Sequence, residues 1–238
     1  MPVVEDASTP SPAAAVFRTL SFRMTAREAE RLENRHLLVG LACTWVVGIG
    51  RWWDDPKAGL VQHLGLGSVL YVFVLAALLW ILVLPLGPER WSYRMVVTFV
   101  SLTSPPALLY AIPVERFFPI DVAGQINLWF LAVVAAWRVA LLVRFLVSVP
   151  GVGKVKGVVV SFLPLAAIVA SLTALNLHRV VFSIMGGIAE SDRTAHDAAY
   201  SVLVSLTLLA VMALPVLLAA YLIAIGHGFW ARRRRRDE

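Results

Sequence analysis

Charged residues are scarce in this 238-residue chain. Only 15% of the positions are Asp, Glu, Lys or Arg, whereas 59% are hydrophobic, and the mean hydropathy is +0.78. Soluble globular domains average about 25% charged and about 45–50% apolar residues. The composition therefore excludes a water-soluble globule, a disordered chain and a fibrous protein, and it predicts an integral membrane protein.

Cysteine is almost absent, and the common catalytic motifs are missing. The single Cys43 excludes an intramolecular disulfide and a cysteine-based zinc or iron–sulfur site. No HExxH, GxSxG, P-loop or paired-carboxylate motif occurs. We therefore expect no cofactor, no metal and no catalytic residue. The competing hypothesis is a metal site of Asp192 and His196 with Asp54 or His63, because Asp192 and His196 are one helical turn apart.

Long apolar runs dominate what is present. Crossing a hydrocarbon core of about 30 Å requires roughly 20 apolar residues in a helix. Six segments meet this requirement, although the first has a core of only fourteen residues, Leu37 to Gly50. The six predicted spans are His36 to Trp53, Gly65 to Leu86, Met95 to Pro113, Gly124 to Val147, Val155 to Leu177 and Tyr200 to Gly226.

The distribution of basic residues predicts the topology. With six spans and both termini in the cytoplasm, fifteen of the 21 basic residues fall on the inner side and five on the outer side. This asymmetry is the positive-inside pattern. Because a five-span protein would expose one of its two basic ends outside, the count favours six spans. The richness in Ala, Val, Leu and Arg, with only three lysines, favours a bacterial inner membrane.

These observations predict an all-α fold, a polytopic integral membrane helical bundle of about six transmembrane helices. Residues 1–14 are expected to be a disordered start, and residues 15–35 an amphipathic helix at the cytoplasmic interface. In that segment Thr25 and Glu28 form a capping box, and Phe17 and Met24 face the leaflet. Residues 36–230 are the six-span domain, whose helices associate through small residues such as Gly40, Gly48 and Gly50. Residues 231–238 form a basic cytoplasmic tail.

The tail is predicted to bind lipid rather than nucleic acid. Its five consecutive arginines follow Trp230 and have no interleaved aromatic residues on which bases would stack. Attraction to anionic phospholipids explains the run with fewer assumptions. The predicted lipid-binding residues are Arg232, Arg233, Arg234, Arg235 and Arg236.

The third predicted span carries two adjacent prolines. Pro105 and Pro106 have no N–H to donate to the carbonyls of Ser101 and Leu102, so we expect a kink or a break there. Four hydroxyls lie nearby, on Thr98, Ser101, Thr103 and Ser104. Freed carbonyls beside hydroxyls predict a substrate or ion site. The alternative is that the hydroxyls bond back to those carbonyls in a span that is only bent.

Arg138 lies close to the middle of the fourth predicted span, and all fifteen acidic residues fall outside the six segments. Three interpretations compete. In the first, Arg138 extends toward the head groups near Arg144. In the second, it faces the bundle interior and binds an anion or a lipid phosphate together with Ser101, Ser104, Pro105 and Pro106. In the third, it pairs with another helix. The lack of buried carboxylates argues against a proton or sodium relay.

Three classes of function follow. The first is a non-enzymatic subunit or scaffold of a membrane assembly, in contact with the lipid bilayer and with a membrane-protein partner or a second copy of the chain. The second is a small transporter or channel that uses the broken third span and Arg138. The third is a membrane enzyme at the extracytoplasmic face. We favour the first, because no catalytic motif is present and the loops are short.

Overall fold

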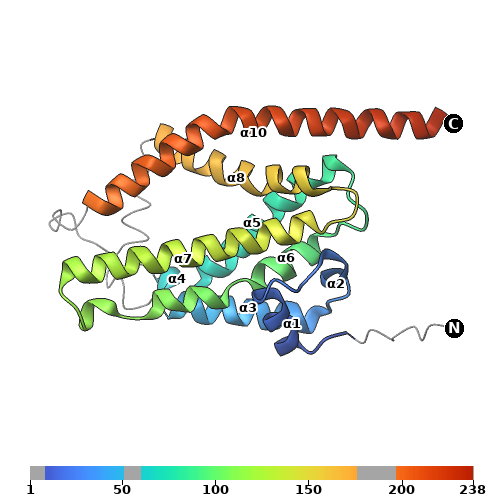
Figure 1. Ribbon diagram of the computed structural model, residues 1–238. Coiled ribbons are helices and arrows are strands. Elements are labelled where there is room, and N and C mark those ends of the chain that lie inside the picture. Colours follow the sequence, from blue (N-terminus) through green and yellow to red (C-terminus); the bar gives the residue numbers. More distant parts are fainter. Residues whose placement is uncertain (1–8, 51–59, 176–196, 238) are drawn as a thin grey trace.

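The computed structural model describes residues 9–50, 60–175 and 197–237, and within them the fold is entirely helical (Figure 1). The longer helices lie roughly side by side along a common direction. The principal α-helices are α3 (Asn34–Ile49), α5 (Leu66–Val83), α6 (Tyr93–Leu102), α7 (Ile120–Val147), α8 (Lys154–Ala174) and α10 (Asp197–Asp237). The shorter helices are α1 (Pro12–Leu20), α2 (Ala26–Glu30) and α4 (Leu60–His63), with 3₁₀ turns η1 (Leu84–Leu86), η2 (Pro105–Ala111) and η3 (Val114–Arg116).

Four of the described helices are long and apolar enough to cross a membrane. They are Leu66–Leu86, Asp121–Val147, Lys154–Ser171 and Ser205–His227, and they overlap four of the six predicted spans. A fifth candidate is the bent pair Tyr93–Leu102 and Pro105–Arg116, which overlaps the predicted third span. The structure thus supports a helical membrane protein with four or five candidate spans. The predicted count of six is not confirmed, because α3 is a shorter apolar helix of 16 residues.

The N-terminal segment forms two helices, α1 and α2, instead of the single helix predicted over residues 15–35. The predicted capping box is confirmed: the Thr25 hydroxyl accepts from the Glu28 N–H, and the Glu28 carboxylate accepts from the Thr25 N–H. Helix α1 begins at Pro12 after the capping residue Ser11, inside the stretch predicted to be disordered. A Pro at the first helical position suits a helix start, because its missing N–H would have no partner there.

This segment packs on the bundle, which differs from the leaflet contact that we expected for all its apolar residues. Met24 is 2% exposed and belongs to the main core, whereas Phe17 is 63% exposed. Specific polar contacts fix the segment: the Ala26 N–H donates to Ser148 Oγ at 2.8 Å, and His36 Nε2 lies 2.7 Å from the Pro10 carbonyl oxygen. Apolar side chains dissolve equally well in lipid and in a protein core, so composition alone does not distinguish the two environments.

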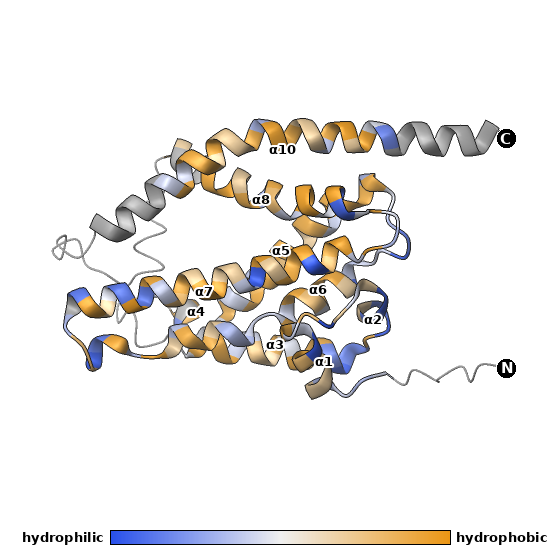
Figure 2. Ribbon diagram, viewed as in Figure 1, coloured by the Kyte–Doolittle hydropathy of each residue, from blue (hydrophilic) through white to orange (hydrophobic). Residues whose placement is uncertain are grey.

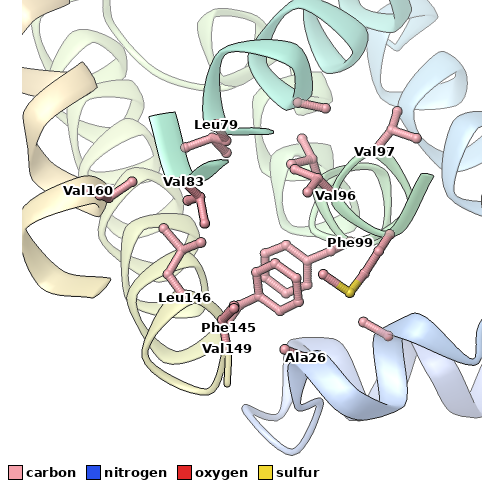
Figure 3. Packing of buried hydrophobic residues seen from close by; sticks show 14 of the residues in the cluster. Ala26, Leu79, Val83, Val96, Val97, Phe99, Phe145, Leu146, Val149 and Val160 are labelled. Atoms are coloured by element: carbon pink, nitrogen blue, oxygen red, sulfur yellow. The ribbon is translucent and has the colours of Figure 1, made fainter. Parts of the chain in front are cut away.

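Helix α6 lies at the centre of the core. All eight residues from Met95 to Leu102 are buried, against neighbours in α1, α2, α3 and α5. Phe99 stacks on Phe145 of α7 with ring centroids 3.8 Å apart, and Val96 and Leu146 lie around this pair (Figure 3). Burial of a large aromatic side chain contributes roughly 1.5–3 kcal/mol, so this contact is a principal link between α6 and α7.

Helix α10 lies outside α8 and buries little of its apolar stretch. Helix α10 packs along α8 and contacts η1, where the Tyr221 hydroxyl donates to the Leu82 carbonyl at 2.8 Å. Only 6% of the apolar stretch Ser205–His227 is buried, compared with 22–39% of the other three candidate spans. Figure 2 shows apolar residues along most of the coloured part of α10.

One end of the bundle gathers α2, the loop after η1, the loop between α7 and α8, and the end of α10 (Figure 1). We call it the basic end, because the sequence places Arg27, Arg31, Arg90 and Lys154 in these segments, together with Arg232 to Arg236. The loop around Glu115 and Arg116 lies at the opposite end. This arrangement is what the positive-inside asymmetry requires of a bundle.

Single-cysteine labelling in a Cys43→Ala background tests the topology. We assume that the basic end faces one aqueous compartment and that α3 crosses the membrane. Cysteines that replace Glu33 or Asp237 will then react with an impermeant thiol reagent from the same side. Cysteines at Lys57 and Glu115 will react only from the other side. Labelling of Glu33 and Asp237 from opposite sides would contradict the six-span hypothesis.

Candidate functional site

The predicted break in the third span is confirmed. Helix α6 ends at Leu102, the chain restarts as the 3₁₀ turn η2 at Pro105, and the two parts are bent by 43°. The Ser101 carbonyl, which Pro105 cannot serve, accepts instead from the Ser104 N–H at 3.2 Å. The tighter 3₁₀ pattern thus satisfies one of the two carbonyls that the prolines release.

The four hydroxyls near the break are all bonded within the protein. Thr98, Ser101 and Thr103 donate to the backbone carbonyls of Arg94, Thr98 and Val100 at 2.7, 2.8 and 2.7 Å. The Ser104 hydroxyl lies 2.7 Å from the Thr44 hydroxyl of α3, and Thr44 also donates to the Gly40 carbonyl. This is the pattern of the alternative interpretation, in which hydroxyls compensate a bent segment. The binding role of Ser101, Ser104, Pro105 and Pro106 stays a prediction.

The same residues form a close crossing of α3 and α6, which we call the α3–α6 seam and define as Gly40, Thr44, Ser101 and Ser104. A Cβ at Gly40 would lie 2.2 Å from Ser101 Oγ and 2.9 Å from Ser101 Cβ. Only glycine therefore fits at this position. The prediction that Gly40, Gly48 and Gly50 mediate helix association is confirmed, because a Cβ at Gly48 would meet Gly65 at 2.8 Å and one at Gly50 would meet Ala111 at 2.7 Å.

Arg138 lies on the inner face of α7. Residues 134, 138, 141 and 145 follow a spacing of four, three and four, which places them on one side of a helix. Val134, Leu141 and Phe145 are 1–2% exposed, and Arg138 is half-buried among them. Val134 packs in a small cluster with Ala107, the residue that follows the two prolines. Arg138 thus lies one turn from the point where α7 meets the broken segment.

The surroundings of Arg138 leave its guanidinium unpaired within the described part of the chain. Its neighbour Trp137 donates from Nε1 to the Leu20 carbonyl at 3.1 Å, so the end of α1 lies beside α7 at this level. No hydrogen bond or ion pair joins Arg138 to another described residue. Arg144, by contrast, is exposed near the end of α7. Arg138 thus lies on the bundle side of α7, and its role in binding stays a prediction.

The remaining predicted sites fall largely outside the described residues. Asp54, Asp192 and His196 all lie there, so only His63 of the hypothetical metal site is described, at the end of α4. Among residues 9–50, 60–175 and 197–237, no three His, Cys, Asp or Glu side chains gather as a metal site would require. Arg232 to Arg236 lie in the last turns of α10, which continues to Asp237.

No protein-family model, curated protein or solved structure matches this chain. Its function must therefore be inferred from its own residues.

Substitution of Gly40 tests the α3–α6 seam. Gly40→Ala should lower the free energy of unfolding in detergent by about 1–3 kcal/mol, because an added Cβ forces Ser101 or the backbone of Leu102 to move. Gly67→Ala is the matched control, since a Cβ there meets no atom within 4 Å. Ser101→Gly in the Gly40→Ala background should restore part of the loss. Equal thermal stability of the Gly40 and Gly67 variants would contradict this account.

A comparison of two arginines on α7 tests the predicted anion site. Arg138→Ala should weaken binding of inorganic phosphate or phosphatidylglycerol by about tenfold, the typical effect of losing one charged hydrogen-bonding group. Arg144→Ala is the control, because that side chain is exposed. Equally small effects of both substitutions, measured on protein of unchanged melting temperature, would refute a site at Arg138.

Proposed function

We propose that the protein is a non-enzymatic, multi-pass subunit or scaffold of a membrane assembly, and that α10 is the helix to which its partner binds. The observation that carries the proposal is the slight burial of α10, whose apolar stretch Ser205–His227 is 6% buried. A helix that buries so little of its apolar stretch leaves most of that surface for lipid or for another protein. The short loops and the absence of catalytic motifs in the sequence support the same function.

The exposed side of α10 has the geometry of a helix-packing surface. Leu209, Met212, Val216 and Ile223 are 61–69% exposed and are spaced by three, four and seven residues. This spacing keeps them on one row, the pattern along which helices pack at a shallow angle. We call these four residues the α10 row. Ala210 and Tyr221, which are 8% and 9% exposed, belong to the other side, which faces the bundle.

The charge of Arg232 to Arg236 indicates whether a second copy of the chain or a different protein binds the α10 row. Two copies inserted in the same orientation would pair their α10 helices in parallel. Arg232 to Arg236 of both chains would then lie at the same level, and like charges at close range destabilise a contact. We therefore propose a partner whose spanning helix is followed by acidic residues on the side of the basic end. Such residues would pair with the arginines and fix the orientation.

The broken segment supports a second candidate function. A 43° bend beside a half-buried, unpaired Arg138 is the arrangement expected of a small transporter for an anion or a lipid phosphate. The internal hydrogen bonds of Thr98, Ser101, Thr103 and Ser104 weaken this candidate, because those hydroxyls would have to exchange partners to bind a substrate. We therefore place it second.

Site-specific photo-crosslinking in native membranes tests the proposed interface. A photoreactive residue at Met212 or Val216 should give one discrete adduct with another membrane protein. The matched control is Leu70 of α5, which is 64% exposed but lies outside the α10 row. Replacing Arg232 to Arg236 by glutamine should reduce the adduct, whereas replacement by lysine should preserve it, because the charge is retained.

Three results would overturn this proposal. The first is the same adduct from Leu70, which would indicate random encounters. The second is an adduct that does not respond to removal of the arginines. The third is an adduct with the mass of two identical chains, which would make the protein a homo-oligomer.

A further inference from the structure

A polar cavity of about 320 Å³ opens at the basic end, between α2 and two loops that are far apart in the sequence. Its charged lining residues are Arg27, Glu30 and Arg31 of the N-terminal segment and Glu89 and Arg90 of the loop after η1. Ligand pockets in proteins begin at about 300 Å³, so the cavity has the size of a small polar group and not of a whole lipid.

Short-range contacts hold the cavity open. The Glu89 N–H donates to the Pro150 carbonyl at 2.9 Å, which fastens the loop after η1 to the loop between α7 and α8. Gly151 has φ +84°, and a Cβ there would lie 2.8 Å from the Gly87 carbonyl oxygen, so the two loops touch through their backbones. The hydrogen bond from Ala26 to Ser148 fastens α2 to the same place. The walls are thus fixed before any ligand arrives.

The charges of the lining favour a monoanion. Three arginines against two glutamates leave one net positive charge. Glu30 is engaged by Arg90 at 3.9 Å, whereas Arg27 and Arg31 form no ion pair within the described part of the chain. These two are four residues apart at the end of α2, so they face the same side and repel each other. A bound phosphodiester would relieve this repulsion by accepting from both guanidinium groups.

The floor and the depth of the cavity favour a lipid as the source of the phosphodiester. The floor is apolar, formed by Ala26, Met95, Val149 and Pro150, and Figure 3 shows Ala26 and Val149 near each other beside the core. The candidate span Leu66–Leu86 ends three residues before Glu89, and Asp121–Val147 ends two residues before Val149, so both end beside the lining. The cavity therefore lies at the level of the lipid head groups. Basic pockets at that level between helices are typical sites for anionic lipids.

We propose that this cavity, which we call the α2 pocket, binds the head group of an anionic phospholipid, with its phosphodiester on Arg27 and Arg31. Arg90 holds Glu30 away from the phosphate. The net positive charge of the lining favours a lipid of net negative charge over zwitterionic phosphatidylcholine, and the Glu89 carboxylate accepts hydrogen bonds from the hydroxyls of a glycerol head group. The site is separate from Arg232 to Arg236 and from Arg138, and it does not depend on α10 having a partner.

A photoactivatable phosphatidylglycerol with its reactive group beside the head group tests the α2 pocket. The full-length protein in nanodiscs should give adducts on the peptides that contain Met95 or Val149. Arg27→Gln with Arg31→Gln should lower this labelling by about tenfold, since two charges near an anionic lipid are removed. Arg23→Gln with Arg144→Gln is the matched control, because both arginines are exposed and neither lines the pocket.

Competition measurements identify the ligand. Excess unlabelled phosphatidylglycerol should compete, whereas phosphatidylcholine and free glycerol 1-phosphate should not. Competition by glycerol 1-phosphate at equal concentration would show that the pocket binds a soluble anion and would contradict the lipid proposal. Equal losses of labelling in both double variants would show that general surface charge, and not the α2 pocket, attracts the lipid. Unchanged labelling in the Arg27 and Arg31 variant would refute the site. Equal melting temperatures of the two variants in phosphatidylcholine nanodiscs establish that both are folded.

Discussion

The structure depends on one constraint: α6 is buried on every side, so each polar group that it carries must find a partner inside the protein. Lipid and an apolar core are alike in offering no hydrogen bonds, and an unsatisfied group costs several kcal/mol in either. Thr98 and Ser101 meet this demand through carbonyls of α6 itself, and Ser104, just after the helix, does so through Thr44 of α3. The bond between Ser104 and Thr44 fixes the register of α3 against this segment, in which Gly40 lies on Ser101.

The sequence predicts those features of the fold that depend on local chemistry. Apolar runs of bilayer length give four of the candidate spans, and two missing N–H groups give the break at Pro105 and Pro106. Thr25 followed by Glu28 gives the capping box, since both partners lie within one turn. Each of these is set by residues that are close along the chain.

The features that the sequence does not predict depend on contacts between distant segments. An apolar side chain such as Met24 suits either lipid or protein, and only the packing of α2 on Ser148 decides between them. The partner of Ser104 depends on the register of two helices. The α2 pocket joins residues near positions 27, 90 and 150, and no motif connects them. Its one sequence signal was the pair Arg27 and Arg31, which resembles any basic helix face.

The core around α6 and α7 and the outer helix α10 are held in place by different contacts. The core is fixed by close backbone approach at Gly40 and by aromatic stacking of Phe99 on Phe145, which leave little freedom of movement. Among the described residues, helix α10 is held by its contacts with α8 and η1 and by the bond from Tyr221, and its interior Pro215 removes the donor to the Val211 carbonyl. A proline at the middle of a weakly packed helix is a point at which the helix bends at small cost. Movement or docking of α10 is therefore compatible with an unchanged inner core, which is the property required of a subunit that binds a partner without rearranging itself.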